Sequence, residues 1–270
     1  YATGKTVPCF EEGEARTVSL QGAPRDVRAF CCCRLVHDYD IVSCHHVVLL
    51  QLANKLSWSD GREPPKLPEL ASWCADRAEY VDHISEVHSL PRDEDRYPDF
   101  RKDLAKLLVL RLLYGGAYSA WIHDALKRPA EMEPRSPRVE KFAAEIKELR
   151  AAVFASNEWR SFCTKDDERL QREGSKSSQE ERQRSTFSRV ATSIENTILS
   201  SMRKFVAAEG FKVRTLCFDG LTVEHTDGKL LDLVRIREHV LKETSYDVAV
   251  VEKPLYSETF PELSLTRTKT

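Results

Sequence analysis

The sequence predicts an α+β fold, and three observations carry that prediction. Residues 34–41 (RLVHDYDI) alternate in a way that indicates a strand with Asp38 and Asp40 on one face. Residues 213–224 (VRTLCFDGLTVE) place Asp219-Gly220 between two apolar runs, which predicts a β-hairpin with that pair at the turn. Most of the chain between these segments has helical spacing, so we expect a small sheet with packed helices.

Composition indicates an ordinary globular protein. The 270 residues are 41% apolar and 31% charged, enough to bury a full core in one large domain or two small ones. The net charge of −2 gives no overall basic signature, so any nucleic-acid binding requires a local basic groove. We find no run of 18 apolar residues and expect no membrane partner.

The eight cysteines do not form a recognisable disulfide framework. Three of them, residues 31–33, are consecutive in a strand-like run, where neighbouring side chains point in opposite directions and cannot share one zinc ion. We therefore expect reduced thiols and an intracellular location, with nucleus, cytoplasm and organelle left open. The chain begins at Tyr1, which suggests a fragment or a processed protein, and we expect residues 1–16 to be loose and 259–270 to be a tail.

Asp40 is the first candidate functional residue. It lies near the end of the predicted strand, and the turn from Ser43 to His46 leads into an apolar helix at 47–52. A buried carboxylate needs a compensating partner, and a metal ion at the end of a core strand is a common one. The alternative is that Asp38 or Asp40 caps the helix or pairs with an arginine.

Two basic groups precede this strand. Arg25 and Arg28 are three residues apart, so on a short helix they would share a face and could hold phosphates. The alternative is simple solvent exposure.

The strongest helical pattern covers residues 99–113 and ends at Tyr114-Gly115-Gly116, where glycine can stop a helix. Lys102, Lys106, Leu110 and Tyr114 recur every four residues and form one stripe. Two cations followed by an apolar and an aromatic residue suit a nucleotide, with cations for phosphates and flat surface for the base. A solvated lysine face is the alternative.

The remaining pattern is mainly helical. Residues 161–185 are charged and serine-rich, and we expect either a long exposed loop or a charged helical insertion. The other expected elements are a loop at 57–70, one or two helices at 71–90, helices at 117–126, 139–155, 186–209 (with Glu195) and 230–241, and a strand at 247–251.

Asp40 and Asp219 on adjacent strands could bracket two Mg²⁺ ions, the arrangement used for in-line phosphoryl displacement. Mg²⁺ needs only one or two carboxylates beside substrate oxygens and waters, so two aspartates suffice; Mn²⁺ is an alternative ion. The lysine stripe would neutralise charge on the phosphates. The competing explanation for Asp219 is that a tight turn favours Asp-Gly.

In this order the motifs resemble the family A (DNA polymerase I-like) DNA polymerases. The segment Leu20-Gln21…Pro24-Arg25…Arg28-Ala29-Phe30 resembles the family's Leu-Gln-x-x-Pro…Arg-x-x-Phe segment. Asp40-x-x-Ser43 resembles motif A, and Lys102-x-x-x-Lys106 with Leu110 and Tyr114-Gly115 resembles motif B. Phe218-Asp219-Gly220 resembles motif C, which is usually His-Asp-Glu.

The resemblance implies a fold and roles. It implies a polymerase palm with an antiparallel sheet at 17–56 and 186–258, and helical fingers inserted at 57–185. Asp40 and Asp219 would bind the metal ions, and Lys106, with Lys102, would contact the triphosphate and act on pyrophosphate. Ser43, His45, Leu110, Tyr114 and Gly115 would lie at the incoming nucleotide. Gln21, Arg25, Arg28 and Glu195 would approach the primer-template.

The sequence departs from the family at several positions. Lys102 replaces an arginine, Leu110 an aromatic residue and Gly220 the second acid of motif C. His45 stands where the family's sugar-discriminating glutamate would be, so selection of deoxynucleotides over ribonucleotides is open. No full thumb or exonuclease domain fits, as in compact family A-like polymerases of virophages, transposon-like viruses and plasmids.

The resemblance implies template-directed DNA synthesis from dNTPs on a primer-template. A primase, helicase or thumb on the same polypeptide would be a further partner. Two alternatives stay open: a single-subunit RNA polymerase-like or sugar-indifferent enzyme, and a non-catalytic polymerase remnant that binds nucleic acid.

Overall fold

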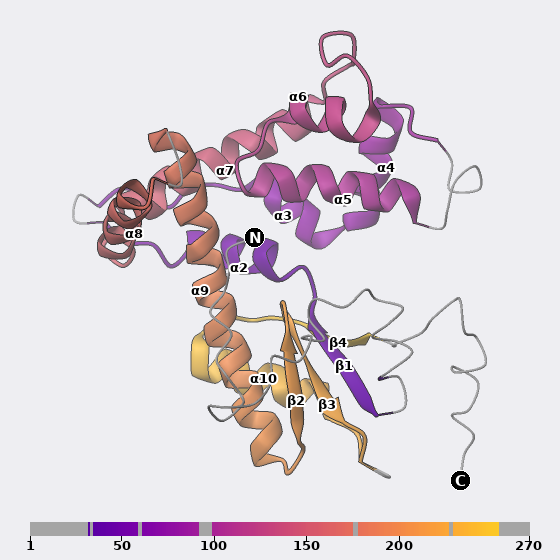
Figure 1. Ribbon diagram of the computed structural model, residues 1–270, viewed down its shortest axis with the longest axis vertical. Coiled ribbons are helices and arrows are strands. Elements are labelled where there is room, and N and C mark those ends of the chain that lie inside the picture. Colours follow the sequence, from indigo (N-terminus) through magenta and orange to yellow (C-terminus); the bar gives the residue numbers. More distant parts are fainter. Residues whose placement is uncertain are drawn as a thin grey trace. The chain divides into compact units, whose positions relative to one another are not determined.

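The structure is a computed structural model that describes residues 32, 35–58, 61–91, 99–174, 178–226 and 229–253. In this part of the chain, strands and helices follow one another in a mixed order (Figure 1). They are β1 (Val36–Ile41), α2 (Cys44–Ala53), α3 (Pro68–Ala75), α4 (Arg77–Val87), α5 (Phe100–Leu113), α6 (Tyr118–Trp121), the π-helix η3 (Ile122–Leu126), α7 (Pro137–Ala155), α8 (Arg160–Arg172), α9 (Gln179–Ala208), β2 (Val213–Cys217), β3 (Gly220–Glu224), α10 (Leu233–Thr244) and β4 (Val250–Lys253).

The chain divides into two compact units. We call residues 1–44 with 193–270 the sheet unit, and residues 45–192 the helical unit. One unit is therefore built from both ends of the chain, and the other is a single inserted segment. The insertion expected from the sequence covered 57–185, and the observed divisions fall inside helices α2 and α9.

The sheet unit contains a four-stranded sheet in the order β2-β3-β1-β4, with antiparallel neighbours throughout. Along β1, His37, Tyr39 and Ile41 are buried, whereas Asp38 and Asp40 are half-buried. The predicted alternation is confirmed, because both acids lie on the less buried face of a central strand.

The hairpin predicted at 213–224 is confirmed, but its turn differs by one residue. Cys217 pairs with Gly220, so Phe218 and Asp219 form the loop and Gly220 is already part of β3. Phe218 has a positive φ of 52°, a conformation that a non-glycine residue rarely adopts. Placing Asp219-Gly220 at the turn was therefore wrong, and the reason for the glycine lies in the sheet.

Helix α10 begins three residues later than predicted because Asp232 caps it. The Asp232 carboxylate accepts hydrogen bonds from the backbone N–H groups of Val234 (3.0 Å) and Arg235 (3.1 Å). The sheet unit buries an apolar core from its strands, from the helices α9 and α10, and from the segment between α10 and β4. Its members include Tyr39, Ile41, Ile198, Met202, Leu221, Val223, Ile236, Val240 and Val248.

Helix α5 of the helical unit ends where the sequence predicted. Gly115 has a φ of +77° and donates its N–H to the carbonyl of Leu112 at 2.8 Å. Aromatic rings fill the core of this unit. Trp73 and Tyr80 meet edge to face with centroids 5.5 Å apart, and Phe142 lies 6.4 Å beyond Tyr80.

A buried carboxylate connects α7 to the start of α3. Glu145 accepts hydrogen bonds from the backbone N–H groups of Glu69 (2.9 Å) and Leu70 (3.0 Å). Helix α3 has no side-chain cap of its own, so Glu145 satisfies amides that would otherwise lack partners.

Residues 161–185, for which the sequence left loop and helix open, are mostly helical, in α8 and the beginning of α9. Buried Asp166 of α8 binds Arg169 and Arg189, both at 3.0 Å, and accepts a hydrogen bond from Thr186 at 3.0 Å. This network explains how a highly charged sequence packs as helix, since each buried charge has partners.

The helix predicted at 117–126 consists of the short α6 followed by the π-turn η3. In the described part of the chain, every helix is too short or too polar to cross a bilayer.

Candidate functional site

Asp40 and Asp219 lie together at one end of the sheet. Asp40 pairs across the ladders with Gly220 of β3 and Val251 of β4. The backbone N–H of Ile41 donates to the carbonyl of Asp219 at 3.0 Å, which fixes the hairpin turn beside the end of β1. The two residues are 179 positions apart in the sequence, and the sheet brings their carboxyl groups within interaction distance.

The surroundings of Asp40 disfavour its negative charge. Burial raises the pKa of Asp40 to about 6, helped by the charge of Asp219 and a hydrogen bond with that group. A contact with the ammonium group of Lys253 acts in the opposite direction and lowers the pKa. The pair therefore carries more negative charge than its protein neighbours neutralise, which is the condition that favours a bound cation.

The backbone around Gly220 leaves no room for a side chain at this position. A Cβ atom built at this position would lie 2.3 Å from the carbonyl oxygen of Tyr39 and 3.2 Å from the Cα of Asp40. Backbone atoms cannot yield at that distance without opening the ladder between β1 and β3. A glutamate here would therefore disrupt the strand that carries Asp40, and the structure leaves Asp40 and Asp219 as the acidic pair.

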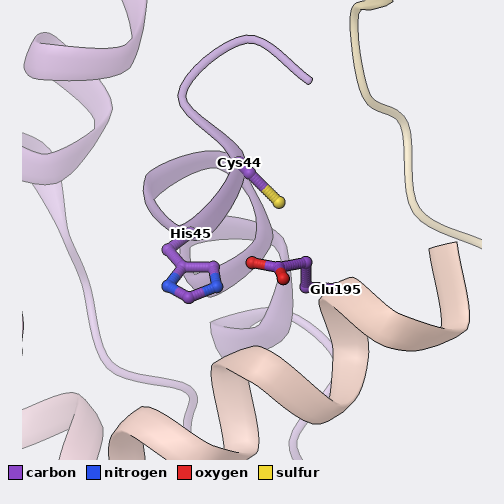
Figure 2. A group of neighbouring side chains, drawn as sticks. All are labelled: Cys44, His45 and Glu195. Atoms are coloured by element: carbon purple, nitrogen blue, oxygen red, sulfur yellow. The ribbon is translucent and has the colours of Figure 1, made fainter. Parts of the chain in front are cut away.

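A second group of metal-ligating side chains surrounds the start of α2. Figure 2 shows Cys44 and His45, consecutive in α2, with Glu195 of α9, and ligand atoms of all three lie within 4.8 Å of one another. Burial, followed by the charges of Glu195, Asp219 and Asp40, raises the pKa of the Cys44 thiol. A thiol, an imidazole and a carboxylate form a donor set that suits Zn²⁺ better than Mg²⁺. The sequence analysis did not identify Cys44.

The stripe on α5 lies on an accessible face of the helical unit. Lys102 and Lys106 are exposed, and Leu110 and Tyr114 are half-buried. Lys102 Nζ lies 3.2 Å from the carboxylate of Asp99, and an ion pair as exposed as this one contributes little to stability. Both ammonium groups are therefore accessible to an anionic ligand.

His45 and Tyr114 meet, although they are 69 residues apart. His45 Nδ1 contacts the Tyr114 hydroxyl, and the two rings are perpendicular with centroids 5.7 Å apart. The next residue, His46, is buried, and burial together with the charges of Arg77, His45 and Lys106 lowers its pKa to about 3. His46 is therefore neutral, whereas His45 is half-buried and contacts Tyr114.

The other predicted residues have simpler outcomes. Ser43 is half-buried in the turn after β1 with a φ of 51°, and Glu195 is half-buried on α9. Gln21, Arg25 and Arg28 lie outside the described residues. The structure thus joins Asp40 to Asp219 within the sheet unit, and His45 to Tyr114 within the helical unit.

Lys253 was missed by the sequence analysis, although it supplies the cation next to Asp40. The only available signal was its position near the end of a predicted strand, which does not identify the neighbouring strand.

No family model matches the chain. A curated relative, "Putative helicase V13" of Sputnik virophage, is 25% identical over 241 residues, which is 88% of this chain and 27% of the relative. The chain therefore spans about a quarter of that relative's length. Among solved structures, the POL domain of Pol1 from M. smegmatis, in complex with DNA primer-template and dNTP, is similar with a TM-score of 0.44 and 13% identity over 82% of this chain and 39% of that one.

Proposed function

We propose that this chain is the catalytic part of a family A-like DNA polymerase that transfers nucleotides from dNTPs to a primer 3′-hydroxyl. The observation that carries the proposal is the pair Asp40 and Asp219, held together on the sheet with their charge incompletely neutralised. The order of the motifs around this pair supports it. The likeness to a solved polymerase is too low to contribute.

The pair fits divalent magnesium. Both side chains offer carboxylate oxygens, the ligand type that Mg²⁺ prefers, and substrate phosphates and waters would complete the coordination. When bound, two ions would lower the pKa of the attacking hydroxyl and stabilise the leaving pyrophosphate. The ammonium group of Lys253 contacts the Asp40 carboxylate and would compete with these ions for it.

The helical unit would bind the incoming nucleotide. In this proposal Lys106 contacts the triphosphate and donates a proton to the leaving pyrophosphate, with Lys102 beside it. Tyr114 lies near the base, Leu110 offers an apolar surface, and Gly115 ends the helix. Under the same proposal Gln21, Arg25, Arg28 and Glu195 contact the primer-template.

His45 bears on the selection of deoxynucleotides over ribonucleotides. His45 occupies the position expected for the family's sugar-discriminating glutamate, and it touches the Tyr114 hydroxyl. An imidazole lacks the carboxylate of that glutamate, so the group expected to oppose a ribose hydroxyl is absent. The residue type at position 45 therefore favours the alternative of a sugar-indifferent polymerase.

A helicase is the partner that the comparisons favour. The virophage relative that matches 88% of this chain bears the name "Putative helicase V13", and the match covers only 27% of its length. We therefore include in the proposal a helicase activity that opens the template, on the same polypeptide or on a separate one.

Primer extension tests the proposal. A labelled primer-template is incubated with the protein, Mg²⁺ and either dNTPs or rNTPs, beside Asp40→Ala, Asp219→Ala and the matched control Asp38→Ala. Asp38 lies on the same face of β1, opposite Thr222. We expect templated extension that only the first two variants lose. Activity that survives both would refute the site, and DNA binding without extension by the intact protein would favour the non-catalytic alternative.

A further inference from the structure

Two arginines lie at the C-terminal end of α5, where the stripe of Lys102, Lys106, Leu110 and Tyr114 ends. A Cβ atom built on Gly115 would lie 2.6 Å from Nη1 of Arg150, on α7, and 2.8 Å from Cγ of Arg184, on α9. The two side chains therefore occupy the space that any other residue at position 115 would need. Glycine at this position lets both arginines approach the backbone directly after Tyr114.

The charges of these arginines are incompletely balanced. Arg184 donates to Glu180 at 2.5 Å, while Arg150 lies 3.8 Å from the same carboxylate, which is largely exposed. Arg150 is only 7% exposed, and Nε of Arg184 is buried without a hydrogen-bond partner. Two guanidinium groups thus share one carboxylate, and a buried N–H donor stays unused. Buried arginines with a purely structural role normally have hydrogen-bond acceptors for their N–H groups.

We propose that Arg150 and Arg184 bind a backbone phosphate of single-stranded DNA. Guanidinium groups match phosphate oxygens in pairs, and a phosphate would supply both the missing negative charge and the missing acceptors. Identifying the strand as the template rests on the proposed function; binding of the phosphate does not.

The position separates this phosphate from those of the incoming nucleotide. Gly115 follows Lys106 by nine residues, which corresponds to about 13 Å along a helix at 1.5 Å per residue. A triphosphate held at Lys106 would not extend over that length. A DNA strand can extend over that length, because its phosphates repeat along the whole backbone.

The competing explanation is structural. Positive charge at the C-terminus of a helix is favourable, so the arginines could serve only to stabilise α5. The two explanations differ in one measurable respect. Burial and the neighbouring charge of Arg184 lower the pKa of Arg150, so its charge is unfavourable in the unliganded protein. Replacing Arg150 with an apolar residue of similar length should therefore preserve or raise the melting temperature.

The test measures binding of fluorescent oligo(dT) by anisotropy, in EDTA and without nucleotide, at several salt concentrations. The variant is Arg150→Met with Arg184→Gln. The control is Lys165→Gln with Arg172→Gln, which removes two exposed charges from α8. We expect the variant to bind about tenfold more weakly, and its slope of log affinity against log salt to become shallower by about 0.7, the contribution of one single-strand phosphate contact. The control should keep the parental slope.

Three results would overturn the inference. They are equal losses in the variant and the control, a lower melting temperature for Arg150→Met alone, and unchanged oligonucleotide binding with a raised KM for dNTP, which would assign the arginines to the triphosphate. Because the assay contains neither metal nor nucleotide, it gives a result even if the chain does not polymerise.

Discussion

Replacing Asp40 with asparagine should stabilise the metal-free protein while abolishing the proposed polymerase activity. In the folded chain the pKa of Asp40 is raised from 3.8 to about 6, mainly by burial and by Asp219, with the contact from Lys253 already included. Each pKa unit corresponds to about 1.4 kcal/mol, so ionising Asp40 costs at most about 3 kcal/mol. Solvent screening at this half-buried site reduces the expected gain to about 1–3 kcal/mol for Asp40→Asn at pH 8.

The gain should depend on pH with a definite sign. The folded protein holds the Asp40 proton more tightly than the unfolded chain, so wild-type stability falls as pH rises from about 4 to about 6. Asparagine does not titrate. The difference between variant and wild type should therefore be smallest below pH 4 and reach its full size above pH 7.

Urea unfolding in EDTA between pH 4 and 8 measures this difference, with Asp38→Asn as the control for the loss of one charge from β1. Adding Mg²⁺ should then stabilise the wild type and not Asp40→Asn, because ligand binding to the folded state raises its stability. A variant that is less stable than wild type at pH 8, or a difference that is independent of pH, would refute the reasoning.

Other substitutions probe the sheet, a helix start and the proposed nucleotide site. Gly220→Ala should destabilise the chain by about 2–4 kcal/mol in urea unfolding, because its Cβ would press on the Tyr39 carbonyl. Glu145→Ala should cost about 1–3 kcal/mol in the same assay, because the amide of Leu70 and its neighbour lose a buried acceptor. Lys106→Ala should lower kcat/KM for dNTP about 100-fold in single-nucleotide incorporation, without weakening oligonucleotide binding measured by anisotropy. Wild-type unfolding energies for Gly220→Ala, or parental kinetics for Lys106→Ala, would contradict these assignments.

Local patterns were sufficient to predict the elements that carry the acids and the lysines. Alternation along residues 36–41 places Asp40 on the less buried face of β1, and the structure confirms this. The end of α5 at Tyr114 was predictable because the glycine that follows takes a positive φ. Both signals depend only on residues close in sequence.

The hairpin turn shows where local patterns fail. Asp-Gly is a favoured turn pair, so the sequence placed Asp219 and Gly220 at the turn. In the structure the turn consists of Phe218 and Asp219, one residue earlier than predicted. Gly220 lies inside β3, where glycine is required because the backbone at Tyr39 passes so close to it. That requirement comes from the neighbouring strand, and nothing within residues 213–224 reveals it.

Contacts between segments that are distant in the sequence could likewise not be predicted from local patterns. Lys253 reaches Asp40 because β4 pairs with β1, an order that the chain does not encode locally. Arg150 and Arg184 belong to separate helices, and only their packing on Gly115 brings them together. Their periodicity was that of ordinary charged helices.

The central claim is that Asp40 and Asp219 together hold the divalent ions used for nucleotidyl transfer. Counting bound Mn²⁺ by electron paramagnetic resonance, with primer-template and a non-hydrolysable dNTP present, tests it most directly. The account predicts about two ions for the wild type and for Asp38→Asn, and the loss of at least one from both Asp40→Asn and Asp219→Asn. Unchanged Mn²⁺ binding in the last two variants would contradict it.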